Sequence, residues 1–172
     1  TNVVDEKLAG FELAAVYGPL SVQSEYMTAS FERSGAANAH FNSGYIFVSY
    51  KREDLPRIVS FMHRITSWGY PIWYDQGIPG GAEWDALIEE KVCRCKIFLV
   101  FLSDAAVESK WVRREIKLAD SENRPILGIR LDRDVVLRHG LKITMRQYQM
   151  IDASAANFSG ELRKAIEYTR LL

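Results

Sequence analysis

The 172-residue sequence has little of what would indicate several large classes of protein. No apolar run approaches the roughly 20 residues that a helix needs to span a bilayer, so we expect no membrane contact. Basic and acidic residues number 22 each, and this zero net charge gives no sign of a one-signed surface for nucleic acid. The chain begins at Thr1 with neither an initiator methionine nor a signal peptide, so we expect a piece of a longer protein.

Cysteine and histidine are also scarce. Two cysteines, Cys93 and Cys95, stand too close together for an unstrained disulfide, and three scattered histidines do not supply an obvious metal site. We therefore expect reduced thiols, no bound metal and a cytoplasmic location.

The sequence lacks the patterns of two enzyme classes and of phosphate-receiver domains. The first predicted strand is not followed by Gly-x-Gly-x-x-Gly, and the chain has no Gly-x-Ser-x-Gly, which argues against a dinucleotide-binding dehydrogenase and a nucleophile-elbow hydrolase. The first strand ends in Tyr50-Lys51 and the third in Leu102-Ser103, where a phosphate receiver would carry acidic residues. No histidine lies near Ser49 or Ser103 in the sequence, so a catalytic triad is only a remote alternative.

What is present has an ordinary globular profile, with 48% hydrophobic and 26% charged residues. Residues 1–43 differ from the rest. Two strand-like segments, 11–17 and 20–27, flank a Gly-Pro turn, and the small polar segment 34–43 has the composition of a linker. We predict an N-terminal extension and linker over 1–43, either a hairpin or disordered, and a separate domain over 44–172.

Residues 44–172 alternate between two kinds of hydrophobic pattern. Short apolar runs predict strands at 45–50, 70–74, 96–102 and 125–129, with a weaker one at 147–151. Helices are predicted from Glu53-Asp54 with Pro56 in the first turn to Gly69, around 84–92, around 111–119, and after a Ser159 cap; 132–140 is irregular or a short helix. This alternation predicts an α/β, flavodoxin-like, doubly wound sheet of five parallel strands in the order 2-1-3-4-5, with helices on both faces.

Ligands of such sheets bind beyond the carboxyl ends of the strands, where the strand order reverses. The loops that meet there begin at Tyr50, Asp75 and Ser103. Trp111 and Glu115 follow the third strand and are four residues apart, so a helix places them on one side. A carboxylate beside an aromatic ring is a plausible holder of a sugar. The alternative is that Trp111 belongs to the core and Glu115 to a solvated helix face.

Three segments now resemble the boxes of one family, in its order and spacing, over residues 44–172. They are Phe47-Val-Ser-Tyr50 with Lys51-Arg52 and Glu53-Asp54; Trp73-Tyr-Asp75 with Ile78-Pro79-Gly80 and Trp84; and Leu102-Ser103 with Ser109-Lys-Trp111 and Glu115. The chain resembles a TIR (Toll/interleukin-1 receptor) domain of the bacterial type, although Tyr45 and Ile46 replace the usual early acidic residue.

The resemblance implies one of two functions. Some TIR domains cleave NAD at the nicotinamide–ribose bond, giving nicotinamide and ADP-ribose or a cyclic isomer, and carry a glutamate at the position of Glu115. NAD is then the substrate, and no cofactor is implied. Others are non-enzymatic scaffolds for signalling. The presence of Glu115 favours the enzyme, and the family implies a role in bacterial immunity or virulence.

A single carboxylate can assist cleavage of the nicotinamide–ribose bond, because loss of nicotinamide leaves an oxocarbenium-like sugar beside a neutral leaving group. We expect Glu115 to stabilise that charge, and Tyr50 and Trp84 to wall the nicotinamide. Trp84 is alternatively the start of a core helix face.

Two cations and two further residues complete the predicted site. Lys51 and Arg52 are expected to meet phosphate or ribose oxygens, or else to be solvated charges. Asp75 opens the glycine-rich loop, or only caps a turn. Trp111 is counted with the substrate-binding residues, although we expect it to pack under the site wall more than to touch the ligand.

The loop that contains Ile78, Pro79 and Gly80 is the predicted contact with other TIR domains. Enzymatic members of the family generally build the working site from two neighbouring subunits, so we expect self-association to activate this chain.

Overall fold

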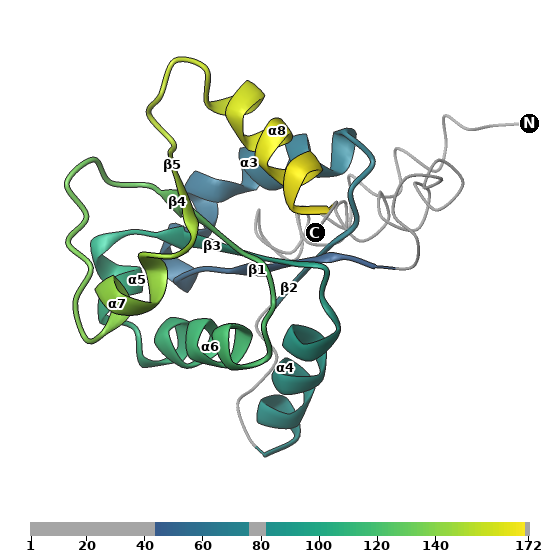
Figure 1. Cartoon of the computed structure of the whole chain (residues 1–172), viewed down its shortest axis with the longest axis vertical. Helices are drawn as coiled ribbons and strands as arrows, with labels where there is room; N and C mark the ends of the chain where they lie inside the picture. The colour runs from purple at the N-terminus through teal and green to yellow at the C-terminus, as the bar shows by residue number, and fades with distance from the viewer. Residues whose placement is uncertain (1–43, 76–81, 171–172) are drawn as a thin grey trace, which may run out of the picture. The chain divides into compact units, whose positions relative to one another are not determined.

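The computed structural model describes residues 44–75 and 82–170, and in them five parallel strands form one sheet (Figure 1). The strand order is β2-β1-β3-β4-β5. The strands are β1 (Ile46–Ser49), β2 (Ile72–Tyr74), β3 (Ile97–Leu102), β4 (Ile126–Arg130) and β5 (Gln149–Asp152). The predicted flavodoxin-like fold and its strand order are therefore confirmed.

Helices cover both faces of this sheet (Figure 1). They are the 3-10 helix η1 (Arg52–Asp54), α3 (Leu55–Ser67), α4 (Ala82–Arg94), α5 (Asp104–Glu108), α6 (Lys110–Ser121), α7 (Leu141–Met145) and α8 (Phe158–Arg170). Helices α3 and α8 lie on one face, while α4, α6 and α7 lie on the other.

Strand β3 is the centre of the core, because all six of its residues are buried. Successive side chains point to opposite faces of a strand. Phe98 therefore packs with the cluster that α4 and α6 supply, and Phe101 stacks on Phe61 of α3 at 6.0 Å between ring centroids. The continuous apolar run of β3 is what burial on both faces requires.

The start of α3 differs from the prediction in one respect. Pro56 lies in the first turn as predicted, and Gly69 ends the helix with a positive φ of 86°, which glycine adopts without strain. Asp54 occupies the N-cap position but makes no capping hydrogen bond. Its buried carboxylate instead accepts hydrogen bonds from the side chains of Ser103 and Arg57.

Two short helices were not predicted, and one helix cap was predicted wrongly. Helix α5 is capped by Ser103, whose hydroxyl accepts from the Ala106 amide, and its five residues are too few to show a helical period. The stretch 132–140 is irregular as predicted, but α7 follows it. Ser159 is not the cap of α8, which begins at Phe158; its hydroxyl accepts from Arg64 instead.

The predictions for residues 1–43 and for Ile78, Pro79 and Gly80 fall outside the described residues. Among the residues described, no helix is both long and apolar enough to cross a membrane.

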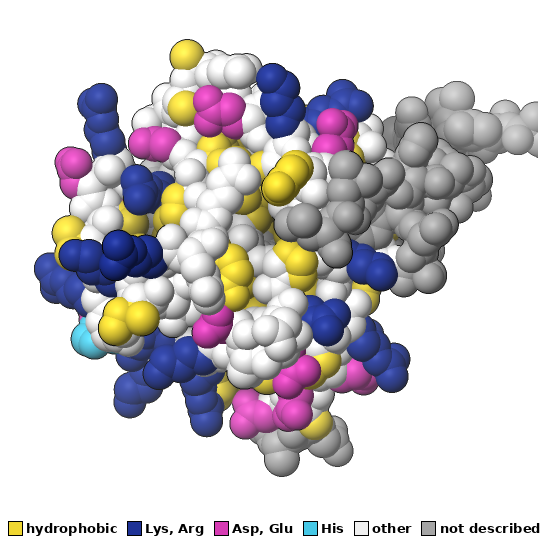
Figure 2. All heavy atoms as spheres, in the orientation of Figure 1, with side chains coloured by type: hydrophobic (Ala, Val, Ile, Leu, Met, Phe, Trp, Pro, Cys, Tyr) yellow, Lys and Arg dark blue, Asp and Glu magenta, His cyan; other side chains and the backbone are white. Residues whose placement is uncertain are grey.

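The charged side chains are unevenly spread (Figure 2). Lysine and arginine gather over α6 and α7, and acidic side chains gather over α4. Helix α6 alone carries four cations, Lys110, Arg113, Arg114 and Lys117. The balanced charges of the sequence are therefore not evenly mixed on the face that Figure 2 shows.

Candidate active site

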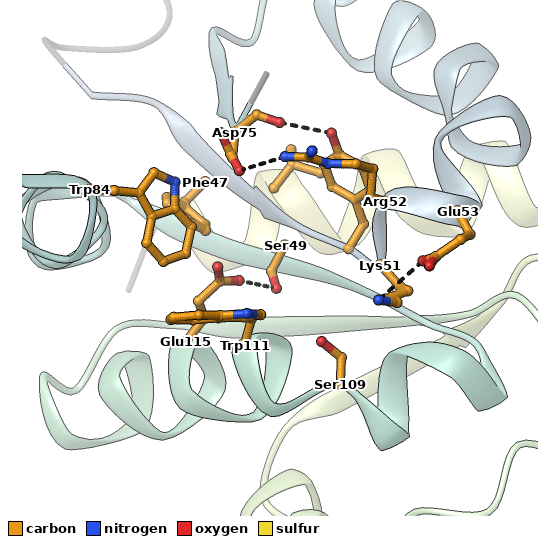
Figure 3. A pocket seen from close by; sticks show the side chains of 12 residues that line it. Phe47, Ser49, Lys51, Arg52, Glu53, Asp75, Trp84, Ser109, Trp111 and Glu115 are labelled. Atoms are coloured by element: carbon orange, nitrogen blue, oxygen red, sulfur yellow. Dashed lines mark hydrogen bonds and ion pairs between the residues drawn. The ribbon is translucent and has the colours of Figure 1, made fainter. Parts of the chain in front are cut away.

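An open pocket of about 380 Å³ lies at the carboxyl ends of β1 and β2, beside α4 and α6 (Figure 3). This is the edge of the sheet where doubly wound proteins bind ligands. The lining residues are Phe47, Val48, Ser49, Tyr50, Lys51, Arg52, Glu53, Asp75, Trp84, Ser109, Trp111 and Glu115.

The Glu115 side chain points from α6 into this pocket, toward the end of β1 (Figure 3). Its Oε2 atom accepts a hydrogen bond of 2.6 Å from the hydroxyl of Ser49. The short distance is typical of a hydroxyl that donates to a carboxylate. Helix and strand are thus joined at the base of the pocket by residues 66 positions apart in the sequence.

The pKa of Glu115 is raised to about 7. Burial is the main cause, since it disfavours the charged form, and the negative charge of Asp75 adds to it. The hydrogen bond from Ser49 acts in the opposite direction. Near neutral pH this carboxyl therefore exists in both protonation states.

Two tryptophans form an aromatic side of the pocket. The rings of Trp84 on α4 and Trp111 on α6 meet edge to face, with centroids 4.8 Å apart and an interplanar angle of 82°. Trp111 is 48% exposed, and the guanidinium of Arg114 lies 5.2 Å from its ring centroid. This pair presents both a ring face and a ring edge to a ligand.

Each cation at the pocket has an acidic partner. Lys51 pairs with Glu53 at 3.2 Å, and Arg52 pairs with Asp75 at 3.6 Å (Figure 3). Tyr50 donates its phenolic hydrogen to the backbone carbonyl of Asp75 at 2.9 Å. Burial raises the pKa of Tyr50 above its ordinary value, so the phenol stays a donor. The contacts of Arg52 and Tyr50 with Asp75 connect the segment after β1 to the end of β2.

The comparisons with known proteins agree with this geometry. The family model for the TIR domain matches residues 46–166, which is most of the chain. This chain belongs to the TIR-domain family.

Solved structures show the same fold at low sequence identity. The TIR domain of a Toll-related receptor from Hydra magnipapillata matches with a TM-score of 0.59 and 14% identity, covering 71% of this chain and 97% of that one. A CMP N-glycosidase from Clostridium botulinum matches with a TM-score of 0.52 and 15% identity, covering 72% and 98%. No curated protein matches the chain.

All seven residues predicted for catalysis and substrate binding in this TIR domain line this pocket: Glu115, Tyr50, Lys51, Arg52, Asp75, Trp84 and Trp111. Their roles stay predictions. The alternative that placed Glu115 on a solvated helix face is wrong, since its carboxylate is partly buried in the pocket and accepts a hydrogen bond from Ser49.

The structure bears on the expectations for two aromatic residues. Trp111 does not pack beneath the wall, because nearly half of its surface is exposed at the pocket. Trp84 satisfies both of its interpretations, since it packs against the core cluster and lines the pocket.

Five further residues line the pocket without having been predicted from the sequence: Phe47, Val48, Ser49, Glu53 and Ser109. A signal for Ser49 was available. It lies two residues after Phe47 on a strand, so the two side chains must share a face, and a polar residue at a buried strand end needs a partner.

Within the part of the chain that the structure describes, no group of three or more His, Cys, Asp and Glu residues is arranged to hold a metal ion. Cys93 and Cys95 are free thiols in this TIR domain.

Proposed function

We propose that this TIR domain is an N-glycosidase that cleaves the nicotinamide–ribose bond of NAD to give nicotinamide and ADP-ribose or a cyclic isomer. The observation that carries the proposal is the Glu115 carboxylate, held by Ser49 in a pocket with an aromatic side. The name of the structurally similar clostridial enzyme, a CMP N-glycosidase, supports N-glycosidic chemistry on this fold.

The proposed reaction needs one negative charge beside the ribose. As the bond to the cationic nicotinamide ring breaks, its electrons leave with the ring, which departs neutral and needs no proton. The ribosyl group becomes positively charged, and an ionised Glu115 stabilises it by direct attraction in a site of low dielectric constant. Water or a nucleophilic group of the same substrate then forms a bond to the sugar carbon, and the proton that water loses passes to the solvent.

The other lining residues have matching tasks. Trp84 and Trp111 contact the planar cationic ring, since aromatic faces attract cations. Lys51 and Arg52 turn from Glu53 and Asp75 toward the pyrophosphate when the substrate binds. NAD is the substrate in this scheme, and no cofactor takes part.

A non-enzymatic scaffold is the second candidate. It is favoured by the two ion pairs, because both pocket cations are neutralised and would have to exchange partners to bind a pyrophosphate. In that case the domain would bind other TIR domains and turn over no NAD. The two candidates share one property, since we also propose that self-association through the segment of Ile78, Pro79 and Gly80 activates the enzyme.

The test is nicotinamide release from NAD by the whole chain at high protein concentration. Glu115→Gln keeps the shape and the ability to accept from Ser49 but cannot become negative, so we expect at least about a 100-fold loss of turnover. The matched control is Glu122→Gln, at the exposed far end of α6, which should keep wild-type activity.

Parallel assays with CMP separate the bond type from the substrate. If the chain released cytosine from CMP but no nicotinamide from NAD, the N-glycosidase activity would stand and NAD would be rejected as its substrate. No turnover of either substrate by the wild-type chain would favour the scaffold, and equal turnover by wild type and Glu115→Gln would mean that the site is placed wrongly.

A further inference from the structure

We propose that Ser49 is a positioning residue of this site, whose hydroxyl holds the Glu115 carboxylate in one orientation, stabilises its charge and leaves its second oxygen for the sugar. The role in turnover rests on the proposed function, whereas the effect on Glu115 does not.

The strand fixes the position of the donor. Ser49 is the last residue of β1, is 2% exposed, and lies in parallel register with Val100 of the central strand. It shares its face of the sheet with Phe47, whose ring stacks on those of Trp73 and Phe98 at 5.0 and 5.3 Å. A hydroxyl on so constrained a backbone sits at one place over α6, which preorganises the acceptor.

The hydrogen bond has one chemical direction. An ionised carboxylate only accepts, so the Ser49 hydroxyl donates to Oε2 of Glu115 across 2.6 Å. One such bond turns the carboxylate plane and leaves Oε1 without a contact to Ser49. We assign Oε1 to the developing charge on the ribose.

No other neighbour performs this task. Among the described residues, Ser49 is the side chain that donates a hydrogen bond to Glu115, and no cation forms an ion pair with it. Tyr50 donates to a backbone carbonyl. On the loops that face Glu115, Lys51 and Arg52 are engaged by Glu53 and Asp75. On its own helix, Arg114 lies over the Trp111 ring.

The equilibrium between the protonated and ionised forms of Glu115 therefore depends on Ser49. Burial and the charge of Asp75 raise the pKa of Glu115, and the Ser49 hydrogen bond is the contribution that lowers it. Loss of the hydroxyl should move this pKa further up. Because the ionised form is the active one, the acid limb of kcat/KM should then move to higher pH.

The experiment compares Ser49→Ala with the wild-type chain in two measurements. The first follows the side-chain carboxyl carbon of Glu115 by ¹³C NMR through a pH titration. We expect the midpoint to rise by about one unit in Ser49→Ala. Ser49→Thr keeps a hydroxyl, so its midpoint should stay close to the wild-type value. Ser121→Ala, at the end of α6, should leave the midpoint unchanged.

The second measurement is the pH profile of NAD turnover. We expect Ser49→Ala to lose roughly 10-fold in kcat/KM near pH 6 and to recover most of it above pH 8.5. An unchanged NMR midpoint, or a loss of equal size at every pH, would overturn the positioning role. If the midpoint shifts but no variant releases nicotinamide, the effect of Ser49 on Glu115 stands and the proposed function fails. Thermal unfolding of each variant identifies any that have not folded.

Discussion

At the scale of single residues, Glu115 shows how a site can oppose the stability of its own fold. The burial that places its carboxylate in the pocket also raises its pKa to about 7, well above the value of an exposed glutamate. The folded state therefore binds this proton more tightly than the unfolded chain does. Below the unfolded pKa of about 4.5 the carboxyl is neutral in both states. Between about 4.5 and about 7 the unfolded chain gives up this proton while the folded state keeps it, so the folded state loses stability as the pH rises through this window.

Glu115→Gln should accordingly stabilise the protein at alkaline pH, because glutamine cannot acquire the buried charge. We expect the free energy of unfolding to exceed that of wild type by about 1–3 kcal/mol at pH 8, and the difference to vanish near pH 4. Urea unfolding at the two pH values measures it. Glu122→Gln should follow wild type at both, and a Glu115→Gln difference that is independent of pH would contradict the assigned cause.

At the scale of elements, a polar network joins the loops around the carboxyl edge of β1, β3 and β4. The buried Asp54 carboxylate accepts from Ser103 and Arg57. Arg57 also donates to Asp132 and to the Leu131 carbonyl, beyond the end of β4. Ser103 at the same time caps α5. One serine therefore satisfies a helix end and a buried carboxylate together.

Ser103→Ala should destabilise the fold by about 1–3 kcal/mol, since it removes the cap of α5 and one donor to a buried carboxylate. Urea unfolding measures the loss. The matched control is Ser67→Ala at the exposed end of α3, where the hydroxyl bonds only to the backbone carbonyl of Arg64. That change should cost less than about 0.5 kcal/mol. Equal costs for the two variants would show that Ser103 has no special role.

At the scale of the whole molecule, the described residues contain the five strands, both helical layers and the pocket. The prediction that 44–172 forms a domain with a separate extension over 1–43 stays a prediction. So does activation by self-association, which concerns several copies of the chain and not the pocket alone.

Self-association predicts that NAD turnover per molecule rises with protein concentration. Ile78→Asp places a charge in the apolar loop segment and should abolish that rise, with roughly a 10-fold loss at high concentration. The matched control is Ile143→Asp on α7, where the side chain is already 82% exposed, and it should behave as wild type. Sedimentation of each variant reports association directly. A concentration dependence that survives Ile78→Asp would remove the loop from the activating contact.

The sequence by itself determined the architecture of this TIR domain, because the information for it is local and repeated. The buried run of β3, the glycine after α3 and the alternation of strands with helices each follow from short-range chemistry, and together they specify a parallel doubly wound sheet. The spacing of Trp111 and Glu115 likewise placed both on one side of a helix beside the predicted crevice.

Only the tertiary structure decided which side chains meet in the pocket. The hydrogen bond between Ser49 and Glu115 joins residues 66 apart, and the pKa of Glu115 depends on burial by several elements at once. The ion pairs of Lys51 and Arg52 depend on loop geometry after the strands. Such contacts are set by which faces pack together, and a sequence pattern reports the face of one element but not the side chain that it meets.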